Sequence, residues 1–431
     1  MGKAQPGKTL GVFIHLAGDF VPAGLLTLLE QDGEPLASRV SYGLRYLDRH
    51  NAAPVDPVSL PIHGADAPEK GTELFPAEGL VLFGGIRDAS PDGWGRRVIE
   101  SRLQAPLNSL PESTYLLEAG SERAGALDVR SSITAAAKVA HGASVQNLDY
   151  LLQAAERIED GLPIPAHLED LFDAGSSMGG MRPKATVQDA EGNLWLAKFP
   201  ARSDTLIDVP VIEAAAMQLA KEAGLKVPPL YTEALGPKNG QKTVMLIRRF
   251  DRARQDGRMH RRHMVSALTL LGCHESESPQ RSYGDIADRI RRYGVAERIV
   301  ADQEELYGRM VFNIFVTNDD DHLRNHAFLW DGEHRGWALS PLYDVMPRPM
   351  LATQRNLHLG IGAQGRLATL DNALSAYARF GLTRVRAEEI IDRVWRVVRQ
   401  WRMYFEGFGV PGGQIKKIAS AFRHIDEIRE K

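Results

Sequence analysis

Short runs of alternating apolar and polar residues open the chain and predict a β-rich first part. GVFIHLAGDF (11–20) and VPAGLLTLLE (21–30) have the alternation of extended strands. The sequence Gln31-Asp32-Gly33-Glu34 is typical of a hairpin turn, and another extended run follows it. Residues 51–78 are rich in Pro and Gly, so we expect a long surface loop there.

Helical patterns come next, and a second β-rich piece follows them. Ser90-Pro91-Asp92-Gly93 predicts a turn, and the residues after it have a helical pattern through Arg102. We expect residues 111–172 to be mainly helical. KATVQ (184–188) and LWLAKF (194–199) predict two strands, since the residues between them suit a hairpin loop.

The remaining pattern is one helix, one strand and then a long helical region. VIEAAAMQLAKEAG (211–224) predicts a helix, because Asp208 and Pro210 stand at its start and Gly224 stands where a C-terminal cap belongs. KTVMLIRRF (242–250) predicts an apolar strand. Beyond about Phe250 we expect mostly helices. The apolar positions at helical spacing are Val394, Val397, Val398 and Trp401, and then Ile415, Ile418, Phe422 and Ile425.

The order of the elements indicates how the whole chain is organised. With 431 residues, the chain is long for one core and suggests two or more packed units. A β-containing half precedes a helical half. This order suits an α+β fold of two lobes with ATP between them, although many other α+β proteins share it.

Composition and charge narrow the function classes. Apolar residues make up 43% and charged residues 25%, the ordinary mix of a globular protein. A net charge of −3 gives the molecule no overall attraction to nucleic acid or anionic membranes. Cys273 is the only cysteine, which excludes intramolecular disulfides and a cysteine-based zinc site and fits a reducing compartment. His15 and Asp19 interrupt the first apolar run, so we expect no signal peptide. No segment approaches the ~20 apolar residues needed to span a bilayer, so we expect no membrane span and a cytoplasmic location.

The segment VFNIFVTNDDDHLRNHAFLW (311–330) carries the strongest chemical signal. Its polar cluster interrupts two apolar runs, and such a cluster is costly unless it is solvated or binds something. Protein kinases use an Asp that accepts the substrate hydroxyl proton and an Asn five residues later that binds magnesium. Only Asp320 has that spacing to Asn325. A further Asp must follow, and LSPLYDV supplies Asp344. A solvated acidic turn can have the same short pattern.

Two upstream segments offer positive charge to a nucleotide. In SSMGGMRPKA (176–185), Gly179 and Gly180 allow close approach to a phosphate, and Lys184 and Arg182 add positive charge. No Walker A pattern is present, and a plain glycine turn would look the same. In LWLAKFP, Lys198 shares a strand face with leucines and is expected to need an anionic partner. Glu213 on the next helix could hold it, as in kinases, or both could be unrelated surface residues.

In this order, the motifs resemble those of the HipA family of bacterial toxin kinases. They are SSMGGMRPKA, WLAKFP, RRFDR, NDDDHLRNHAF and LSPLYDV, preceded by SPDGWGRR. The resemblance covers about residues 10 to 400. It implies an α+β, bilobal protein-kinase-like fold with a β-containing N-lobe and a mainly helical C-lobe. The expected parts are an N-terminal subdomain (10–110), the remainder of the N-lobe (111–247) and the helical C-lobe (248–431).

The resemblance also implies a role for each matching residue. Asp320 would be the catalytic base, and Asn325 and Asp344 would hold Mg²⁺. Ser177 matches the serine that HipA-type kinases autophosphorylate. Some members carry Glu where this chain has Arg248, so side-chain contacts at that position are expected to differ. The residues implied to contact ATP are Ser177, Gly179, Gly180, Lys184, Lys198, Arg248, Phe250, Asp251 and His322, with Asp251 near the ribose.

The resemblance further implies a protein Ser/Thr substrate and a helix-turn-helix antitoxin that tethers the kinase to operator DNA. Translation proteins such as aminoacyl-tRNA synthetases become candidate substrates. Two alternatives stay open. The D-x-H-x-x-N pattern from Asp320 to Asn325 also resembles phosphoinositide kinases, which allows a small-molecule or lipid acceptor. A catalytically silent corepressor is the other alternative, although it would not need all of Asp320, Asn325, Asp344 and Lys198.

Two other clusters of polar residues are candidate binding sites. The segment 248–262 contains seven arginines, which could form a surface for nucleic acid or an acidic substrate, or a solvated loop. His260, His263, Cys273 and His274 could be drawn as a metal site. Their spacing matches no zinc pattern, so we expect no such site.

Overall fold

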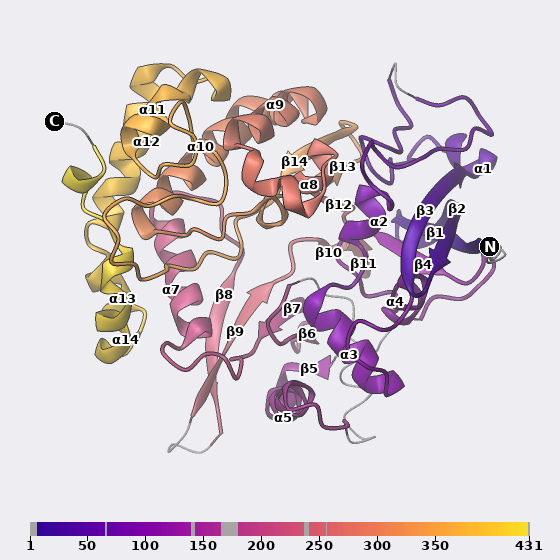
Figure 1. The fold of residues 1–431 in the computed structure, drawn as a ribbon, viewed down its shortest axis with the longest axis horizontal. Coiled ribbons are helices and arrows are strands. Elements are labelled where there is room, and N and C mark those ends of the chain that lie inside the picture. The colour runs from indigo at the N-terminus through magenta and orange to yellow at the C-terminus, as the bar shows by residue number, and fades with distance from the viewer. Residues whose placement is uncertain are drawn as a thin grey trace. The chain divides into compact units, whose positions relative to one another are not determined.

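The chain forms two compact units (Figure 1). Unit 1 comprises residues 1–202, 234–242 and 246–265, and unit 2 comprises residues 203–233, 243–245 and 266–431. The computed structural model describes residues 7–64, 67–138, 143–164, 180–236, 241–255 and 257–429.

Unit 1 begins with an antiparallel sheet in the order β3-β2-β1-β4 (Figure 1). In β3, Ser38, Val40 and Tyr42 are buried and the residues between them are not, which matches the period of two in a strand. In β1, all residues from 10 to 15 are buried, so both faces of this strand are covered. The predicted turn between β2 and β3 is confirmed, and Asp32 and Gly33 both have positive φ, as a tight hairpin needs. The strands are β1 (Lys8–Leu16), β2 (Asp19–Gln31), β3 (Glu34–Tyr42) and β4 (Leu127–Arg130).

The helices of unit 1 confirm one prediction and correct another. The helix predicted after residue 93 is confirmed. The prediction that residues 111–172 are mainly helical was wrong for the described residues 119–138, because Leu127 to Val129 are buried in strand β4 against β1. Its parts at 139–142 and 165–172 lie outside the described residues. Tertiary pairing overrides local propensity there. The helices are α1 (Leu44–Leu47), α2 (Gly84–Asp88), α3 (Gly93–Leu103), α4 (Glu112–Glu118) and α5 (Leu148–Glu159).

The Pro- and Gly-rich segment 51–78 contains no helix or strand of its own among its described residues, but it is not all on the surface. Residues 52–57 are buried. Two tyrosine hydroxyls make this possible: Val55 N donates to Tyr42 Oη at 2.9 Å, and Tyr46 Oη donates to Ala53 O at 2.5 Å. A buried loop needs such partners for its backbone groups.

A second sheet has the order β5-β6-β7-β9-β8 (Figure 1). The predicted hairpin is confirmed: β6 and β7 pair antiparallel, and Asp189 Oδ1 accepts a hydrogen bond from Asn193 N at 2.7 Å in their loop. The strands are β5 (Ala143–Ser144), β6 (Lys184–Gln188), β7 (Leu194–Lys198), β8 (Leu230–Leu235) and β9 (Lys242–Arg248).

The arginine-rich segment is a β-hairpin rather than a solvated loop. Strands β10 (Arg252–Gln255) and β11 (Arg258–Arg261) pair antiparallel, and β12 (Met264–Ser266) follows. Arg249 and Arg252 are buried, whereas Arg254 and Arg258 are exposed. The expectation of mostly helical structure beyond Phe250 was therefore wrong for this stretch.

Unit 2 is mainly helical, as predicted for the C-terminal part. Helix α7 (Val209–Glu222) has the expected cap, since Asp208 accepts a hydrogen bond from Val211 N at 3.4 Å. The long helix α10 (Ile299–Val316) packs against α9 (Tyr283–Tyr293) and α12 (Arg384–Val398). The other elements are α8 (Ala267–Leu271), β13 (Ala327–Asp331), β14 (Gly336–Leu339), α11 (Leu370–Ser375), α13 (Trp401–Gly407) and α14 (Gly412–Ile418).

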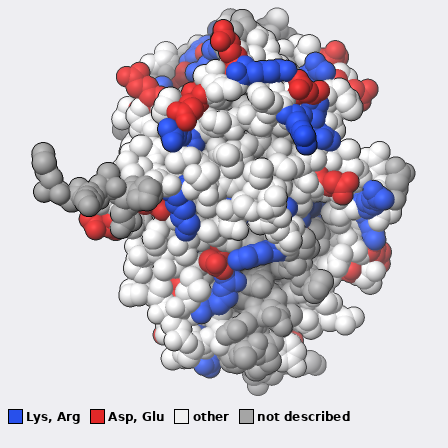
Figure 2. Space-filling view, turned by 90° about the vertical axis from the view of Figure 1, so that its right-hand side faces the viewer, with Lys and Arg blue, Asp and Glu red and all other residues white. Residues whose placement is uncertain are grey.

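Neither unit offers a membrane anchor among these helices. Of the helices that the structure describes, none has both the length and the apolar character needed to cross a lipid bilayer. On the face shown in Figure 2, acidic and basic side chains lie interspersed, with uncharged surface between them. That face carries no extended field of one sign.

Candidate active site

A polar loop with three consecutive aspartates follows the buried end of α10. The helix ends at Thr317, whose φ of 51° turns the chain into the left-handed region. Thr317 Oγ1 donates to Ala421 O at 2.5 Å and accepts from Arg355 Nη1 at 2.6 Å. These bonds fix the point where the loop Asn318–Asn325 begins.

Asp321 is the buried member of the three. Its Oδ2 accepts from Tyr283 Oη at 2.6 Å and its Oδ1 from His358 N at 2.7 Å. Burial raises the pKa of Asp321 to about 7. Tyr283 Oη in turn accepts from Asn313 Nδ2 at 2.8 Å. Asp321 is thus part of a buried polar network and cannot meet a substrate hydroxyl.

Asp320 has the exposure that a catalytic base needs. Its side chain is 50% exposed, whereas that of Asp319 is 21% exposed. Asn325 Nδ2 donates to the backbone oxygen of Asp320 at 2.8 Å, which ties the two predicted residues together. Because the Asn325 side-chain nitrogen makes this hydrogen bond, the side-chain oxygen is the atom that could bind a metal ion. The predicted nucleotide residue His322 lies in the same loop, and its ring meets that of His358 edge-on at 5.9 Å.

Asp344 lies in a second loop that is bonded to the first. Tyr343 Oη donates to Arg324 O at 2.6 Å, and Met346 N donates to Asn318 Oδ1 at 3.3 Å. These two contacts bracket Asp344 and hold it beside the loop of Asp320 and Asn325. Asp344 itself is exposed and has a φ of 59°. This left-handed conformation is uncommon for residues other than glycine and occurs often at functional sites.

The chemistry of this donor set fits Mg²⁺. Asn325 offers an amide oxygen and Asp344 a carboxylate, both hard ligands of the kind this ion selects. Among the described residues there is no group of three or more His, Cys, Asp or Glu that could hold a metal alone. Mg²⁺ typically binds through one or two carboxylates and completes its shell with water and substrate phosphates. A group of three such protein ligands is therefore not required for Mg²⁺ binding.

Unit 1 brings three of the predicted nucleotide residues together. Lys184 and Lys198 stand directly opposite each other in the β6–β7 pair. Residues directly opposite each other in an antiparallel pair share a face of the sheet, so the two lysines give that face positive charge. Gly180 has a φ of 95°, a conformation that favours glycine, and a Cβ at this position would meet Lys184 Nζ. Ser177 and Gly179 lie outside the described residues.

The SPDGWGRR motif lies against this group. Asp92 accepts a hydrogen bond from Gly180 N through its carboxylate, and Trp94 N donates to Gly180 O at 2.9 Å. The fully buried Trp94 also donates from Nε1 to Lys184 O at 2.9 Å. The motif therefore supports the backbone on which Gly180 and Lys184 stand.

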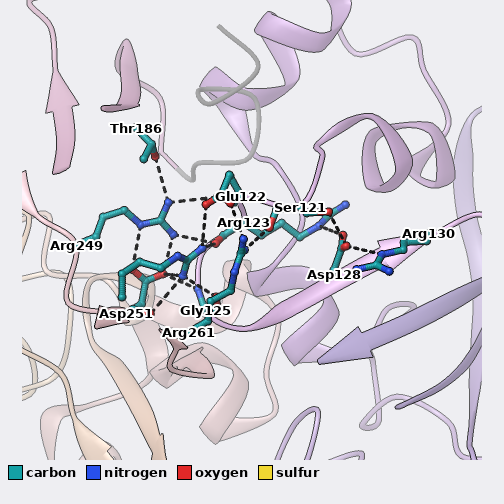
Figure 3. Close-up of polar contacts among 11 residues, drawn as sticks. Ser121, Glu122, Arg123, Gly125, Asp128, Arg130, Thr186, Arg249, Asp251 and Arg261 are labelled. Carbon is teal, nitrogen blue, oxygen red and sulfur yellow. Dashed lines mark hydrogen bonds and ion pairs between the residues drawn. The ribbon is translucent and has the colours of Figure 1, made fainter. Parts of the chain in front are cut away.

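The predicted hinge residues have different surroundings, and Figure 3 shows those of Asp251. Arg248 is exposed and donates to Asn193 Oδ1 at 2.7 Å, and Phe250 is half-buried. Asp251 is buried, accepts from Gly125 N at 2.8 Å, and pairs at 2.8 Å with both Arg249 and Arg252. Burial alone would raise the pKa of Asp251, but the two arginines hold it below its usual value. The position of Asp251 near the ribose stays a prediction. Its hydrogen bond and ion pairs show that it also stabilises the fold of this segment.

Sequence reasoning missed Tyr283 and Arg348. Tyr283 supports Asp321 from helix α9, 38 positions away in the chain. Arg348 contacts Asp319 and Asp320 from the loop that follows Asp344. No local pattern marks Tyr283, but the Pro-Arg-Pro sequence at 347–349 is a signal that could have marked Arg348.

Comparisons with known proteins show what this chain is similar to. The HipA-like C-terminal domain family matches residues 176–401. A Haemophilus influenzae protein named "Putative kinase" is 28% identical over 207 residues, which cover 44% of this chain and 59% of that protein. "Putative kinase Y4mE" of Sinorhizobium fredii is 28% identical over 232 residues, 50% of this chain and 53% of that protein. The chain thus spans little more than half the length of these curated relatives.

A solved structure shows the fold. The toxin–antitoxin complex of HipA, HipB and operator DNA from Shewanella oneidensis MR-1 contains a chain that superposes with a TM-score of 0.64. The match covers 95% of this chain and 94% of that one at 17% identity. The α+β, bilobal arrangement expected from the motifs is confirmed.

Proposed function

Since the chain belongs to the HipA family, we propose that it is an ATP- and Mg²⁺-dependent kinase that phosphorylates a serine or threonine of a protein. One observation carries this proposal. The loop of Asp320 and Asn325 and the loop of Asp344 are bonded to each other, and of the three adjacent aspartates Asp320 has the most exposed carboxylate. The base and the metal ligands of a phosphoryl transfer are thereby available in one unit.

In the proposed reaction, the acceptor hydroxyl oxygen attacks the γ-phosphorus of ATP. The bond between that phosphorus and the β–γ bridging oxygen breaks, and ADP leaves. The Asp320 carboxylate orients the hydroxyl and takes its proton. Asn325 and Asp344 would hold Mg²⁺, which when bound neutralises phosphate charge.

The cations of unit 1 suit the nucleotide. We assign Lys184 and Lys198 to the phosphates, since both cations stand at one position of the β6–β7 pair and on the same face of the sheet. Gly180 leaves room for the Lys184 ammonium. Arg248 and Phe250 are proposed to flank the adenine. Ser177 is proposed as the autophosphorylation site, where a phosphate would repel ATP.

We also propose a helix-turn-helix antitoxin as the partner, through which the kinase reaches operator DNA. The solved complex of the Shewanella protein supports this, because it contains HipA, HipB and operator DNA. The mixed charges seen in Figure 2 and the net charge of −3 favour indirect rather than direct contact with DNA.

The test is Asp320→Asn. Loss of a general base typically lowers the transfer rate by ~10²–10⁴-fold, while the fold and ATP binding should be kept. Phosphate incorporation after incubation with ATP and Mg²⁺, read by intact-mass and peptide mass spectrometry, measures the loss and shows whether Ser177 is modified. Phosphoproteomics after expression of wild type and variant would identify the acceptor class. Near-wild-type incorporation in the variant would refute the assignment of Asp320. If no protein gains phosphate when the wild type is expressed, a small-molecule or lipid acceptor would replace the protein substrate.

A further inference from the structure

The guanidinium of Arg348 faces two of the three aspartates of the polar loop. Its Nη2 donates to Asp320 Oδ2 at 2.9 Å, and its Nε lies 3.1 Å from Asp319 Oδ1 as an ion pair. All three side chains belong to unit 2. Arg348 lies outside the motifs that predicted the site, and the proposed reaction does not use it.

The backbone conformation around Arg348 is fixed without a bound ligand. Pro347 and Pro349 flank it, and a following proline confines a residue to extended conformations. Arg348 N donates to Thr317 O at 3.1 Å, which connects it to the residue where α10 ends. The arginine is therefore held next to the aspartates by its main chain, and its side chain needs little reorganisation to reach them.

The contact constrains a carboxylate that is otherwise mobile. Asp320 is half exposed, so its side chain would sample several rotamers without a partner. The bond to Oδ2 holds the carboxylate in one orientation and leaves Oδ1 to accept a proton. Arg348 also offsets the like charges of Asp319 and Asp320, which would otherwise repel each other and an approaching triphosphate.

We propose that Arg348 is a positioning residue for Asp320, fixing the orientation of the catalytic carboxylate in phosphoryl transfer. This inference rests on the proposed function of Asp320. A misplaced catalytic group slows transfer steeply, because reacting atoms must be held within a fraction of an ångström. In contrast, an exposed ion pair contributes little to folding. The two effects can therefore be separated.

The test compares Arg348→Ala and Arg348→Lys with the matched control Arg384→Ala. Arg384 is a similarly exposed arginine of unit 2 that pairs with one carboxylate, Glu388, at 3.1 Å. Single-turnover transfer of labelled phosphate from ATP to the enzyme and to casein gives the rate, and calorimetry gives the affinity for ATP with Mg²⁺. We expect Arg348→Ala to slow transfer by about 10–100-fold with an ATP affinity within about twofold of wild type. Arg348→Lys should recover part of the rate, because lysine keeps the charge but not the fork of donors.

Three outcomes would overturn the proposal: an unchanged rate in Arg348→Ala, an equal loss in the control, or a loss of ATP affinity that accounts for the whole effect. A double-mutant cycle of Arg348→Ala and Asp320→Asn, measured by the transfer rate, tests whether Arg348 acts through Asp320, because Arg348→Ala should cost little further rate once Asp320 is replaced. Additive losses in the transfer rate would also overturn the proposal. A wild type that transfers no phosphate would refute the proposed function, whereas an active wild type with an unaffected Arg348→Ala variant would refute this inference alone, so the two failures are distinguishable.

Discussion

Asp319, Asp320 and Asp321 are the same side chain three times, yet their surroundings give each a different chemistry. Asp321 is buried behind Tyr283, Asp320 is half exposed, and Asp319 lies between these extremes beside Arg348. Burial raises the pKa of Asp319, and the charge of Arg348 opposes that change. At the residue scale, the environment assigns the roles, as in enzymes that use paired carboxylates for different tasks.

The first residue-scale prediction concerns pH. The folded-state pKa of Asp321, about 7, lies above its ordinary value, so the folded protein binds this proton more tightly than the unfolded chain. Stability from this group is present at low pH and is lost as pH rises from about 4 to about 7. Asp321→Asn should remove that decline. Urea unfolding of both proteins at several pH values measures the difference, which should reach the order of a few kcal/mol. Parallel pH profiles would contradict the prediction.

A second residue-scale prediction uses the backbone of Asp344. Its φ of 59° lies in the left-handed region, which glycine adopts most easily, so Asp344→Gly should keep the fold and change its free energy of unfolding by no more than about 1 kcal/mol. The same change removes a metal ligand and should weaken Mg²⁺-dependent ATP binding. Calorimetry with and without Mg²⁺ separates these effects. Asn325→Ala should weaken the binding less, because it removes a neutral ligand. Undiminished affinity in both variants would place the metal elsewhere.

At the element scale, the hairpin β10–β11 and the segment before it are bonded to the loop 121–125 (Figure 3). Arg249 and Arg252 both donate to Arg123 O, at 2.9 and 2.7 Å, and Arg252 donates to Gly125 O at 2.8 Å. Arginine guanidinium groups thus satisfy buried loop carbonyls that no strand or helix pairs. Asp251 provides the carboxylate that keeps these buried cations paired.

The element-scale prediction is that Asp251→Asn destabilises unit 1 strongly. It removes the negative charge that pairs with Arg249 and Arg252, both of which are buried. Breaking a buried ion pair typically costs roughly 3–5 kcal/mol. Arg254→Ala is the matched control, since Arg254 lies on the same hairpin but is exposed, and it should change stability by less than about 1 kcal/mol. Equal effects in thermal unfolding would show that the network is not important for stability.

On the scale of the whole molecule, two compact units share one chain that passes between them several times. Each has its own buried core, with Ile14 and Val129 in unit 1 and Ile314 and Val394 in unit 2. Proteins of this size and organisation commonly unfold in more than one step.

We therefore expect scanning calorimetry to show more than one transition. Asp251→Asn should lower the transition of unit 1, and Asp321→Asn should alter only that of unit 2. ATP with Mg²⁺ should raise the transitions of whichever units contribute to its binding. A single transition that moves as a whole in both variants would contradict this division.

What the sequence determined by itself follows from local rules. Alternation predicted β1 to β3, and capping residues predicted α7. The spacing from Asp320 to Asn325 predicted a catalytic loop, and the structure joins these two residues by a hydrogen bond. These succeed because capping, turns and strand alternation depend on neighbouring residues. The family resemblance then added the roles of Lys184, Lys198 and Asp344, and Ser177 and Gly179 remain predictions outside the described part of the chain.

Only the tertiary structure decided which aspartate is accessible, which arginines are buried and how the loops are held. Strand β4 pairs with β1, more than 100 positions earlier, and that pairing overrode the helical expectation. Tyr283, Arg348 and the Asp251 network act through contacts between distant segments. Burial and such long-range partners set the free energy of a polar side chain, and neither is written in the residues beside it.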